Sequence, residues 1–475
     1  MKIKKLIFII LILSFNTFVF ADNEINATDE NTEVIENMDV YENGIVVPEI
    51  VAESAVLINQ DTGKVLYSKN PDKRMYPASL TKVLTLLIAT EYIQPDELVV
   101  VGNEINYIPW DSSKAGHVSG EVLTGMNIFR GLVLPSGNET ANVVALYVAK
   151  KETGNESISY EDAEKIFATI MNEKAKELGA KNSNFVTPHG HHDDEHYTTA
   201  SDMMLIVREA MKNNIIREVV SETEYIGNGA GSFATDEMHT QEYNWQTHNK
   251  LLLSADYYYP YATGIKTGYT SLAGSCLAAS ATKDDENLLA VVLNSPDPDR
   301  WIDSKNLFDF GFDNYGFYEI QKDGVIVSES LIDNPPLGED EILEVVTKGS
   351  KSLYLNETEI EKILKKVEID EEVISKNLSE LDEKQLKTPI KNGQKLGEIN
   401  YYIDDKVIFT DSVISTRDVV KRNIGTDLSY YFDLIKNYVL SWKMIPTTAI
   451  VIALVVLLLR RRNKRIKNKY NMKLI

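Results

Sequence analysis

The order of strand-like and helix-like apolar patterns along the chain predicts the fold of its central part. Strand patterns begin this part, where residues 50–66 form two short runs around an Asp-Thr-Gly turn, and they end it. The later strand patterns cover residues 262–269, 275–282 and 287–293. Apolar residues at helical spacing cover residues 80–93, 126–133, 139–150, 161–178 and 301–312. We therefore expect an α+β fold with an antiparallel sheet completed from both chain ends and a helical cluster against it.

A second, smaller unit follows this first one. Short alternating runs recur between residues 319 and 415 and are separated by turns such as Asn392-Gly393. This pattern predicts a small all-β domain over residues 319–415, after a first domain over residues 50–315. An aromatic-containing stalk over residues 416–441 is expected to follow.

The N-terminal end has the pattern of an export signal. Lysines at positions 2, 4 and 5 precede an apolar run that ends in Val19-Phe20-Ala21. Charge, a short apolar stretch and small residues at the cleavage position predict a signal peptide over residues 1–21, with an uncleaved anchor as the alternative. Residues 22–49 are acidic and poor in aromatic residues, which is typical of a flexible leader.

The C-terminal end suggests attachment to a membrane. Residues 445–459 are almost purely apolar, and a dense basic run follows from Arg460. Counted back through Trp442, the stretch predicts a transmembrane anchor over residues 442–459 and a basic cytoplasmic tail over residues 460–475. Residues 22 to about 441 would then lie outside the cell. A helix lying flat on the membrane is the alternative.

Composition and charge exclude several classes of protein. The 475 residues include 49 basic and 71 acidic ones, for a net charge of −22, and 43% are hydrophobic. A chain this apolar is not wholly disordered, and one this acidic lacks the basic face that nucleic acids require. Cys276 is the single cysteine. It allows no intramolecular disulfide, cysteine-based zinc site or iron–sulfur cluster.

The first segment with candidate chemistry runs from Pro77 to Val83. Ser79 and Lys82 lie three residues apart, at the start of a helix that is apolar on nearly every side. A serine hydroxyl needs a base, and a lysine can act as one when burial or a neighbouring cation keeps it neutral. The pattern alone is weak, because it recurs at Ser280 and Lys283 on an expected strand.

Two further segments carry polar groups that could meet the first. Ser136 and Asn138 lie in a loop between two expected helices, where helix capping is the alternative role. Lys266 and Thr267 belong to a Lys-Thr-Gly sequence that occurs once, on a strand rich in β-formers. An ammonium beside a hydroxyl can receive a carboxylate, and the strand edge can pair with an extended peptide, although a protective edge lysine is the alternative.

The three segments and their order resemble one serine peptidase family. Ser-x-x-Lys, Ser-x-Asn and Lys-Thr-Gly, in this order, mark penicillin-binding proteins and serine β-lactamases. The longer matches are similar to the low-molecular-mass D-alanyl-D-alanine carboxypeptidases. They are Tyr76-Pro-Ala-Ser-Leu-Thr-Lys82, Leu134-Pro-Ser-Gly-Asn138, Phe185-Val-Thr-Pro-His-Gly190, His196-Tyr-Thr-Thr-Ala200 and Lys266-Thr-Gly-Tyr-Thr270. The resemblance covers about residues 50–315 and implies a β-lactamase/transpeptidase-like fold for them. The β domain and C-terminal end also look like this family.

The resemblance implies removal of the terminal D-alanine from peptidoglycan stem peptides through an acyl-enzyme, without metal or cofactor, and inhibition by β-lactams. Ser79 would be the nucleophile, Lys82 the general base and Ser136 the proton relay. Asn138 and the Lys266–Tyr269 segment would bind the substrate. Within that segment Lys266 and Thr267 would hold its carboxylate, and Gly268 would precede Tyr269, whose N–H would help to form the oxyanion hole.

Other functions for the same site remain open at this point. A β-lactamase shares the three motifs, but no Glu-x-x-Leu-Asn element follows Asn138. An endopeptidase acting on cross-links, or an inert wall-binding scaffold, are further alternatives. One stretch departs from the family, because His191-His192-Asp193-Asp194-Glu195-His196 follows Gly190 where relatives usually carry a leucine. Metal binding there is a possible reading, and a solvated loop is the expected one.

Overall fold

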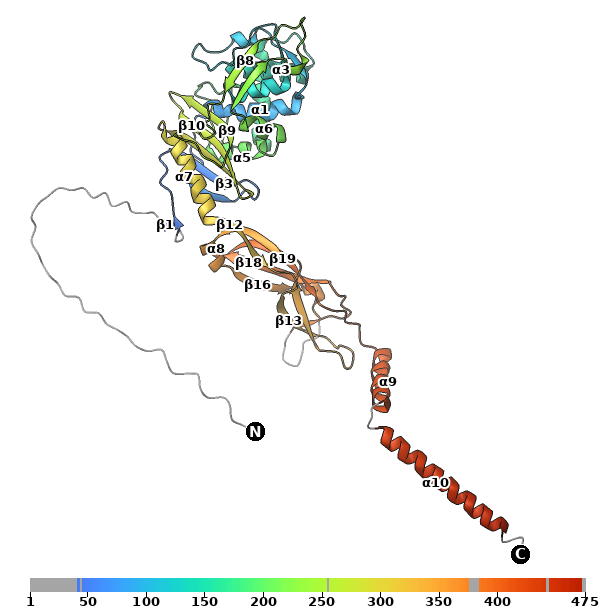
Figure 1. Cartoon of the computed structure of the whole chain (residues 1–475). Coiled ribbons are helices and arrows are strands. Elements are labelled where there is room, and N and C mark those ends of the chain that lie inside the picture. Colours follow the sequence, from blue (N-terminus) through green and yellow to red (C-terminus); the bar gives the residue numbers. More distant parts are fainter. Residues whose placement is uncertain (1–40, 43–44, 254–255, 376–383, 441–443, 472–475) are drawn as a thin grey trace, which may run out of the picture.

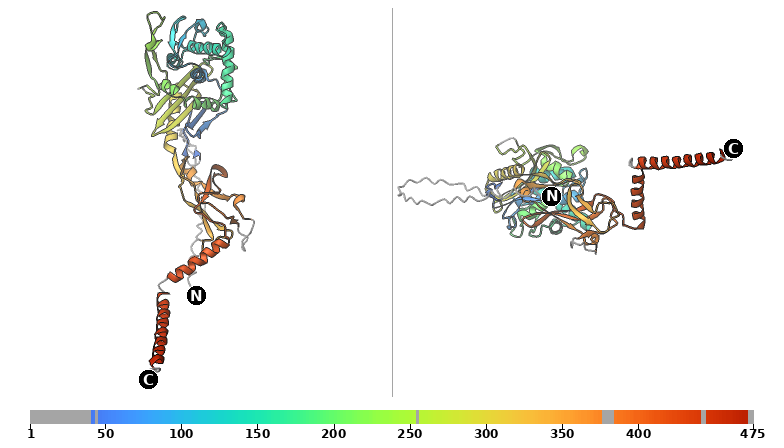
Figure 2. Two further views of the ribbon diagram at one scale, coloured as in Figure 1. Left: turned by 90° about the vertical axis from the view of Figure 1, so that its right-hand side faces the viewer. Right: turned by 90° about the horizontal axis from the view of Figure 1, so that it is seen from below.

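The computed structural model describes residues 41–42, 45–253, 256–375, 384–440 and 444–471. Two folded units follow each other along the chain, and two helices extend from the second unit toward the C-terminus (Figure 1; Figure 2). The expected signal peptide over residues 1–21 lies outside the described residues. At the end of the expected flexible leader, β1 (Tyr41–Glu42) pairs with β2 (Ile45–Val46), so these residues have regular structure.

The first unit is built on a five-stranded antiparallel sheet, as the sequence predicts. The strand order is β4-β3-β11-β10-β9. Strand β3, from the start of this unit, pairs with β11 from its end. The strands are β3 (Ser54–Asn59), β4 (Val65–Lys69), β9 (Ala262–Thr270), β10 (Gly274–Lys283) and β11 (Glu286–Ser295). The expected turn joins β3 to β4 through Gly63, whose φ of 76° suits glycine.

Helices cover both faces of this sheet. One face packs against a helical cluster around α1, and the other against α7, which is the arrangement visible in Figure 1. Alternation along β3 explains the two cores, because Val56 and Ile58 face the cluster while Leu57 faces α7. The helices are α1 (Thr81–Tyr92), α2 (Gly125–Val133), α3 (Asn138–Thr153), α4 (Tyr160–Glu177), α5 (Ala200–Ala210), α6 (Asn214–Ser221) and α7 (Asp299–Asn314).

Several elements of this unit were not expected from the sequence. They are helices α5 and α6 and two antiparallel strand pairs. One pair is β5 (Leu98–Val100) with β6 (Val122–Thr124), and the other is β7 (Glu224–Asn228) with β8 (Glu242–Gln246). A local signal for α5 exists, since the Thr199 hydroxyl accepts a hydrogen bond from the Asp202 N–H and so caps the helix.

The second unit is the small β domain that the alternating pattern predicts. A six-stranded sheet has the order β16-β18-β19-β14-β13-β17, and a separate pair joins β12 to β15. Residues 315–319, where we expected a boundary, belong to β12, which follows α7 directly. The strands are β12 (Tyr315–Gln321), β13 (Ile326–Ile332), β14 (Ile342–Thr347), β15 (Lys351–Asn356), β16 (Leu364–Ile369), β17 (Gln385–Leu386), β18 (Lys395–Ile403) and β19 (Lys406–Ser415).

Polar contacts join the two units at the end of the sheet that lies far from the helical cluster. The Lys64 ammonium donates to the Tyr354 carbonyl at 3.0 Å and to a Glu359 carboxylate oxygen at 2.5 Å. The Tyr354 hydroxyl donates to Glu286 at 3.2 Å. The β domain is therefore held against the first unit through β15 and the short helix α8 (Glu357–Glu361).

The C-terminal end of the chain is helical in its described part. The stalk region forms helix α9 (Ile424–Leu440), and α10 (Met444–Asn471) follows it. Among the described helices, none is both long enough and apolar enough to cross a bilayer. Residues 442 and 443 of the expected anchor over residues 442–459 lie outside the described residues, and the anchor stays a prediction.

Candidate active site

Three segments that are far apart in the sequence meet beside one cavity of about 500 Å³. The 3₁₀ turn η1 (Ala78–Leu80) brings Ser79, the loop between α2 and α3 brings Ser136, and strand β9 brings Thr267. The cavity is lined by Ser79, Asp111, Ser113, Ser136, Thr247, His248, Lys250, Leu253, Thr267, Gly268, Tyr269 and Arg300.

Ser79 and Lys82 form the first contact of the site. Ser79 lies in η1, and α1 begins two residues later, at Thr81. The sequence predicted that Ser79 and Lys82 lie in the same helix, but only Lys82 belongs to α1. The Lys82 side chain is fully buried, and its Nζ lies 2.9 Å from Ser79 Oγ. Nζ also donates to Asn138 Oδ1 at 2.7 Å and to the His189 carbonyl at 3.1 Å. The hydroxyl is left half-buried at the cavity wall.

The loop between α2 and α3 presents Ser136 and Asn138 to this lysine and to Lys266. Ser136 has a φ of 60°, a left-handed conformation that is uncommon for serine. In this conformation its hydroxyl contacts Lys266 Nζ. Helix α3 begins at Asn138 after Gly137, and no side chain caps it. The capping role that the sequence left open is therefore not what Ser136 and Asn138 do.

Strand β9 supplies the third segment from the edge of the sheet. The buried Lys266 Nζ donates to Ser136 Oγ at 2.9 Å and to the Thr267 carbonyl at 3.0 Å. A Cβ on Gly268 would lie only 2.9 Å from the Pro77 carbonyl oxygen and 3.2 Å from the Ser79 nitrogen. Glycine at this position therefore lets β9 approach η1 closely. Tyr269, the next residue, is exposed at the mouth of the cavity.

Burial lowers the pKa of both lysines. Burial lowers the pKa of Lys82 well below its usual value, and the positive charge of Lys266 lowers it further, while Glu139 opposes the change. The pKa of Lys266 falls to about 7, mainly through burial and then through the Arg300 guanidinium. A neutral amine beside Ser79, which the sequence only allowed, is therefore favoured by the site.

Comparisons with known proteins agree with this geometry. The family model for D-alanyl-D-alanine carboxypeptidase matches residues 42–297, more than half of the chain, and that for the C-terminal domain of penicillin-binding protein 5 matches residues 337–421. The chain belongs to the D-alanyl-D-alanine carboxypeptidase family.

Individual relatives cover most of the chain. D-alanyl-D-alanine carboxypeptidase DacF of Bacillus subtilis is 29% identical over 79% of this chain and 88% of its own length. D-alanyl-D-alanine carboxypeptidase DacA of Haemophilus influenzae is 28% identical over 80% of this chain and 88% of its own length. The crystal structure of penicillin-binding protein 5 from Haemophilus influenzae aligns with a TM-score of 0.55 and 25% identity, over 80% of this chain and all of that one.

The site contains residues that no motif of this family revealed in the sequence. Arg300, from the first turn of α7, lines the cavity and donates to the Gly268 carbonyl at 3.2 Å. Ser112 accepts a hydrogen bond from Asn138 Nδ2 at 2.9 Å. Neither residue lies in a short pattern, and both reach the site through contacts that only the folded chain creates.

The histidine-rich loop is more ordered than a solvated loop. His196 is buried, accepts hydrogen bonds at Nδ1 from the Val186 and Thr187 N–H groups, and has Nε2 2.8 Å from Thr81 Oγ1. Thr81 Oγ1 in turn donates to the Ala78 carbonyl at 2.8 Å. The expectation of a solvated loop is thus wrong for His196, which supports the turn that carries Ser79. Within the described residues, no group of three or more His, Cys, Asp or Glu side chains is arranged to hold a metal ion.

Proposed function

We propose that this member of the family releases the terminal D-alanine of peptidoglycan stem peptides, with Ser79 as the nucleophile. The observation that carries the proposal is the set of three contacts around Lys82 Nζ. A neutral amine has two N–H donors and one lone pair. The carbonyl oxygens of Asn138 and His189 can only accept, so they take both donors. The lone pair is then left for the Ser79 hydroxyl, 2.9 Å away.

Lys82 therefore acts as the general base in this proposal. Ser79 Oγ transfers its proton to Lys82 Nζ while it attacks the carbonyl carbon between the two terminal D-alanines. The depressed pKa of Lys82 makes the neutral amine available near neutral pH, because burial and the charge of Lys266 both disfavour a second buried cation.

The oxyanion that forms needs donors close to Ser79. We assign this role to the backbone N–H groups of Ser79 and Tyr269, since β9 approaches η1 closely at Gly268. Such donors are fixed before the reaction and contribute about 3 kcal/mol each to stabilising the transition state. The Arg300 hydrogen bond to the Gly268 carbonyl helps to fix the peptide plane that carries the Tyr269 N–H.

We assign the departure of the leaving group to Ser136 and the binding of the substrate carboxylate to Lys266 and Thr267. Ser136 Oγ, 2.9 Å from Lys266 Nζ, gives its proton to the nitrogen of the departing D-alanine and receives in its place the proton that Lys82 took from Ser79, so Lys82 becomes neutral again. Lys266 and Thr267 hold the terminal carboxylate, and the Arg300 side chain faces the same cavity. A bound carboxylate favours the ammonium form of Lys266, because opposite charges stabilise each other at short range. Water then hydrolyses the ester on Ser79 and restores the enzyme.

Release of D-alanine by the full chain tests this function. A diacetylated tripeptide that ends in D-Ala-D-Ala should yield free D-alanine, and its C-terminal amide should be a much poorer substrate. Labelled penicillin should form a long-lived adduct. Rapid turnover of penicillin without D-alanine release would instead favour the β-lactamase alternative.

We also propose that the enzyme is exported and works at the outer face of the membrane. The charged and apolar pattern of residues 1–21 supports export. The apolar residues 445–459 of α10, followed by the basic run from Arg460, support membrane attachment at the C-terminal end. Carbonate extraction of membranes from cells expressing the full chain, or a chain ending at residue 440, tests the attachment. Equal extraction of both proteins would contradict it.

A further inference from the structure

Trp110 stands out because its side chain is almost fully exposed. It is 92% exposed, whereas Trp245 and Trp301 are both buried. Tryptophan is mostly buried in folded proteins, because exposing its large ring to water is unfavourable. The polar residues 111–113 follow it, and the apolar residues 107–109 precede it. Of these, Tyr107 is half-exposed with its ring packed against Tyr160, and the other two are partly buried. The indole is therefore the one ring of this segment that is almost fully exposed.

The chain around Trp110 is tied directly to the proposed active site. Trp110 lies at the tip of a turn in which the Ser112 N–H donates to the Pro109 carbonyl at 3.2 Å. Ser112 Oγ accepts from Asn138 Nδ2, and the Ser113 carbonyl accepts from the Asn138 N–H at 2.9 Å. Asp111 and Ser113 line the cavity. Trp110 thus lies one residue along the chain from the lining of the cavity.

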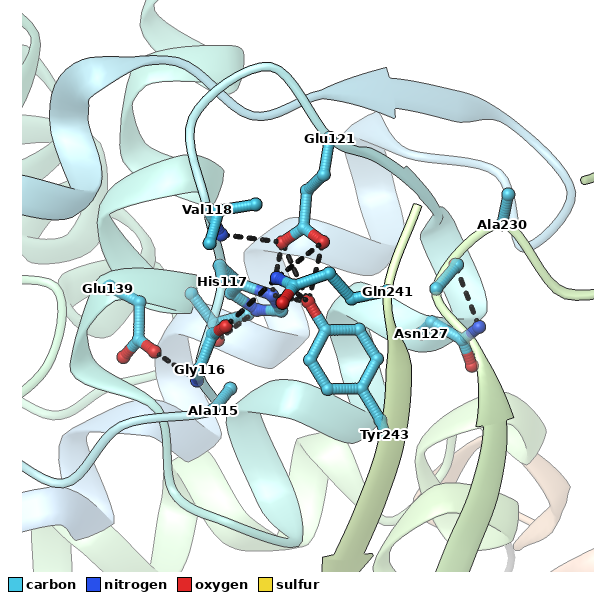
Figure 3. A network of polar contacts seen from close by, with 12 residues as sticks. Ala115, Gly116, His117, Val118, Glu121, Asn127, Glu139, Ala230, Gln241 and Tyr243 are labelled. Atoms are coloured by element: carbon cyan, nitrogen blue, oxygen red, sulfur yellow. Dashed lines mark hydrogen bonds and ion pairs between the residues drawn. The ribbon is translucent and has the colours of Figure 1, made fainter. Parts of the chain in front are cut away.

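A buried polar network holds the rest of this segment in place. The fully buried His117 and Glu121 form an ion-pair contact of 2.9 Å, and the Tyr243 hydroxyl donates to both Glu121 oxygens at 2.8 and 2.6 Å (Figure 3). Trp245 Nε1 donates to the Ala115 carbonyl at 2.8 Å. Strand β8 therefore fixes residues 115–121, and Asn138 holds Ser112 and Ser113 next to Trp110, which limits the motion of the turn before binding.

The chemistry of the surroundings indicates the ligand. A protein or lipid partner would need a broad exposed apolar patch, whereas the apolar residues before Trp110 are half-exposed or partly buried. A pyranose ring fits a single exposed indole better, since it has an apolar face to stack on the ring and polar edges for Asp111 and water. In the proposed function the stem peptide occupies the cavity, and a few extended residues span about 10 to 14 Å. The sugar to which the stem is attached would therefore lie beyond the rim.

We propose that Trp110 is a sugar-stacking subsite that binds the glycan carrying the stem peptide. The subsite rests on the proposed function for its substrate, and it makes the enzyme prefer stems attached to N-acetylated amino sugars over free peptides. The indole takes no part in the acyl transfer. It strengthens substrate binding, so it lowers KM and leaves kcat unchanged.

Two substrates separate this subsite from the catalytic function. With the diacetylated tripeptide, Trp110→Ala should keep the wild-type kcat and KM, which shows that the catalytic site is intact. With a disaccharide-linked pentapeptide, the same variant should raise KM about fivefold with little change in kcat. Phe233→Ala removes another exposed aromatic side chain outside the cavity lining and should change neither.

A binding measurement without turnover provides a second readout. A soluble β-1,4-linked N-acetylglucosamine oligomer should quench tryptophan fluorescence in the Ser79→Ala protein and not in the Ser79→Ala/Trp110→Ala protein. Equal KM values for both proteins on the disaccharide substrate, or quenching that persists without Trp110, would overturn the subsite. An equal rise of KM for the free tripeptide would overturn it as well, because Trp110 would then contact the peptide. Loss of D-alanine release by the wild-type protein would instead overturn the proposed function.

Discussion

Lys82 Nζ lies 2.7 Å from Asn138 Oδ1, and this contact links the two serine-bearing segments. The orientation of the amide is fixed from its other side, because Asn138 Nδ2 donates to Ser112. The oxygen must therefore face Lys82. The contact occupies one N–H donor of the amine and helps to direct its lone pair to Ser79.

Ser112→Ala should weaken this arrangement without unfolding the protein. The amide of Asn138 would lose the partner that fixes its orientation, and Lys82 would be held less well. We expect the second-order rate of penicillin acylation to fall about tenfold, the cost of one hydrogen bond to a positioned group. Stopped-flow acylation kinetics and thermal unfolding measure the two effects.

The controls for Ser112 lie on the same loop. Ser112→Thr keeps a hydroxyl and should restore most of the rate, while Ser119→Ala removes an exposed hydroxyl that bonds Asn103 and should leave it unchanged. An unaltered acylation rate in Ser112→Ala, with a normal melting temperature, would show that Ser112 does not position Asn138.

Glu139→Gln should move the pH dependence of acylation to lower pH. The Glu139 carboxylate raises the pKa of Lys82 against the lowering effects of burial and Lys266. Its Oε1 accepts from the Gly116 N–H at 2.8 Å, a bond that glutamine can keep. Without the negative charge the pKa of Lys82 falls further, so the neutral amine persists to lower pH. The acid limb of the acylation profile reports this change, and an unmoved or upward-shifted limb would contradict it.

Lys266 should limit the activity at high pH, but only for substrates with a free carboxylate. The group must be protonated to bind that carboxylate, and its pKa is about 7 in the free enzyme. kcat/KM for such peptides should therefore fall as the pH rises through this value, while C-terminally amidated peptides should show no such limb from this group.

Lys266→Ala separates the two substrate classes. Removing one partner of a buried charge pair should reduce kcat/KM for free-carboxylate peptides about 100-fold and for amidated ones much less. Parallel assays of a peptide and its amide give the ratio directly. Equal losses for the two would argue against carboxylate binding by Lys266.

Tyr243→Phe should lower the free energy of unfolding. Burial disfavours the Glu121 carboxylate, but hydrogen bonds from His117 and Tyr243 outweigh this and lower the pKa of Glu121. Removing one donor should cost about 1 to 3 kcal/mol at pH 7. The stabilisation by the ionised Glu121 is fully present above the pKa of a glutamate in the unfolded chain, about 4.3. It is lost as the pH falls through the lower pKa that Glu121 has in the folded protein. Denaturant unfolding of both proteins at about pH 7 and about pH 3 measures the difference, which should shrink in acid. A constant difference would contradict this role of Glu121.

The sequence reveals the parts of the site that are local and hides those that depend on the fold. Ser79 and Lys82 are three residues apart, and Ser136 and Asn138 two, so short motifs expose them. Ser112 is 26 residues away in the sequence from its partner Asn138, and Arg300 is 32 residues away from its partner Gly268. Neither belongs to a short motif.

The same distinction applies to the fold. Strands β9, β10 and β11 and helices α1 to α4 carry long apolar periods and were predicted close to their observed bounds. The hairpin of β7 and β8 was missed, because only Tyr243 and Trp245 are buried among polar neighbours and their partners His117 and Ala115 lie far away in the sequence. The anchor expected over residues 442–459 stays a prediction, because its first two residues lie outside the described part and no described helix has the length and hydropathy of a span.

The most direct test of the account is the site of acylation. Wild-type protein incubated with labelled penicillin should gain one adduct by intact mass, and peptide mapping should place it on Ser79. The Ser79→Ala protein should gain none and release no D-alanine, while it melts at the wild-type temperature. A label on another residue, or D-alanine release that persists in Ser79→Ala, would contradict the central claim.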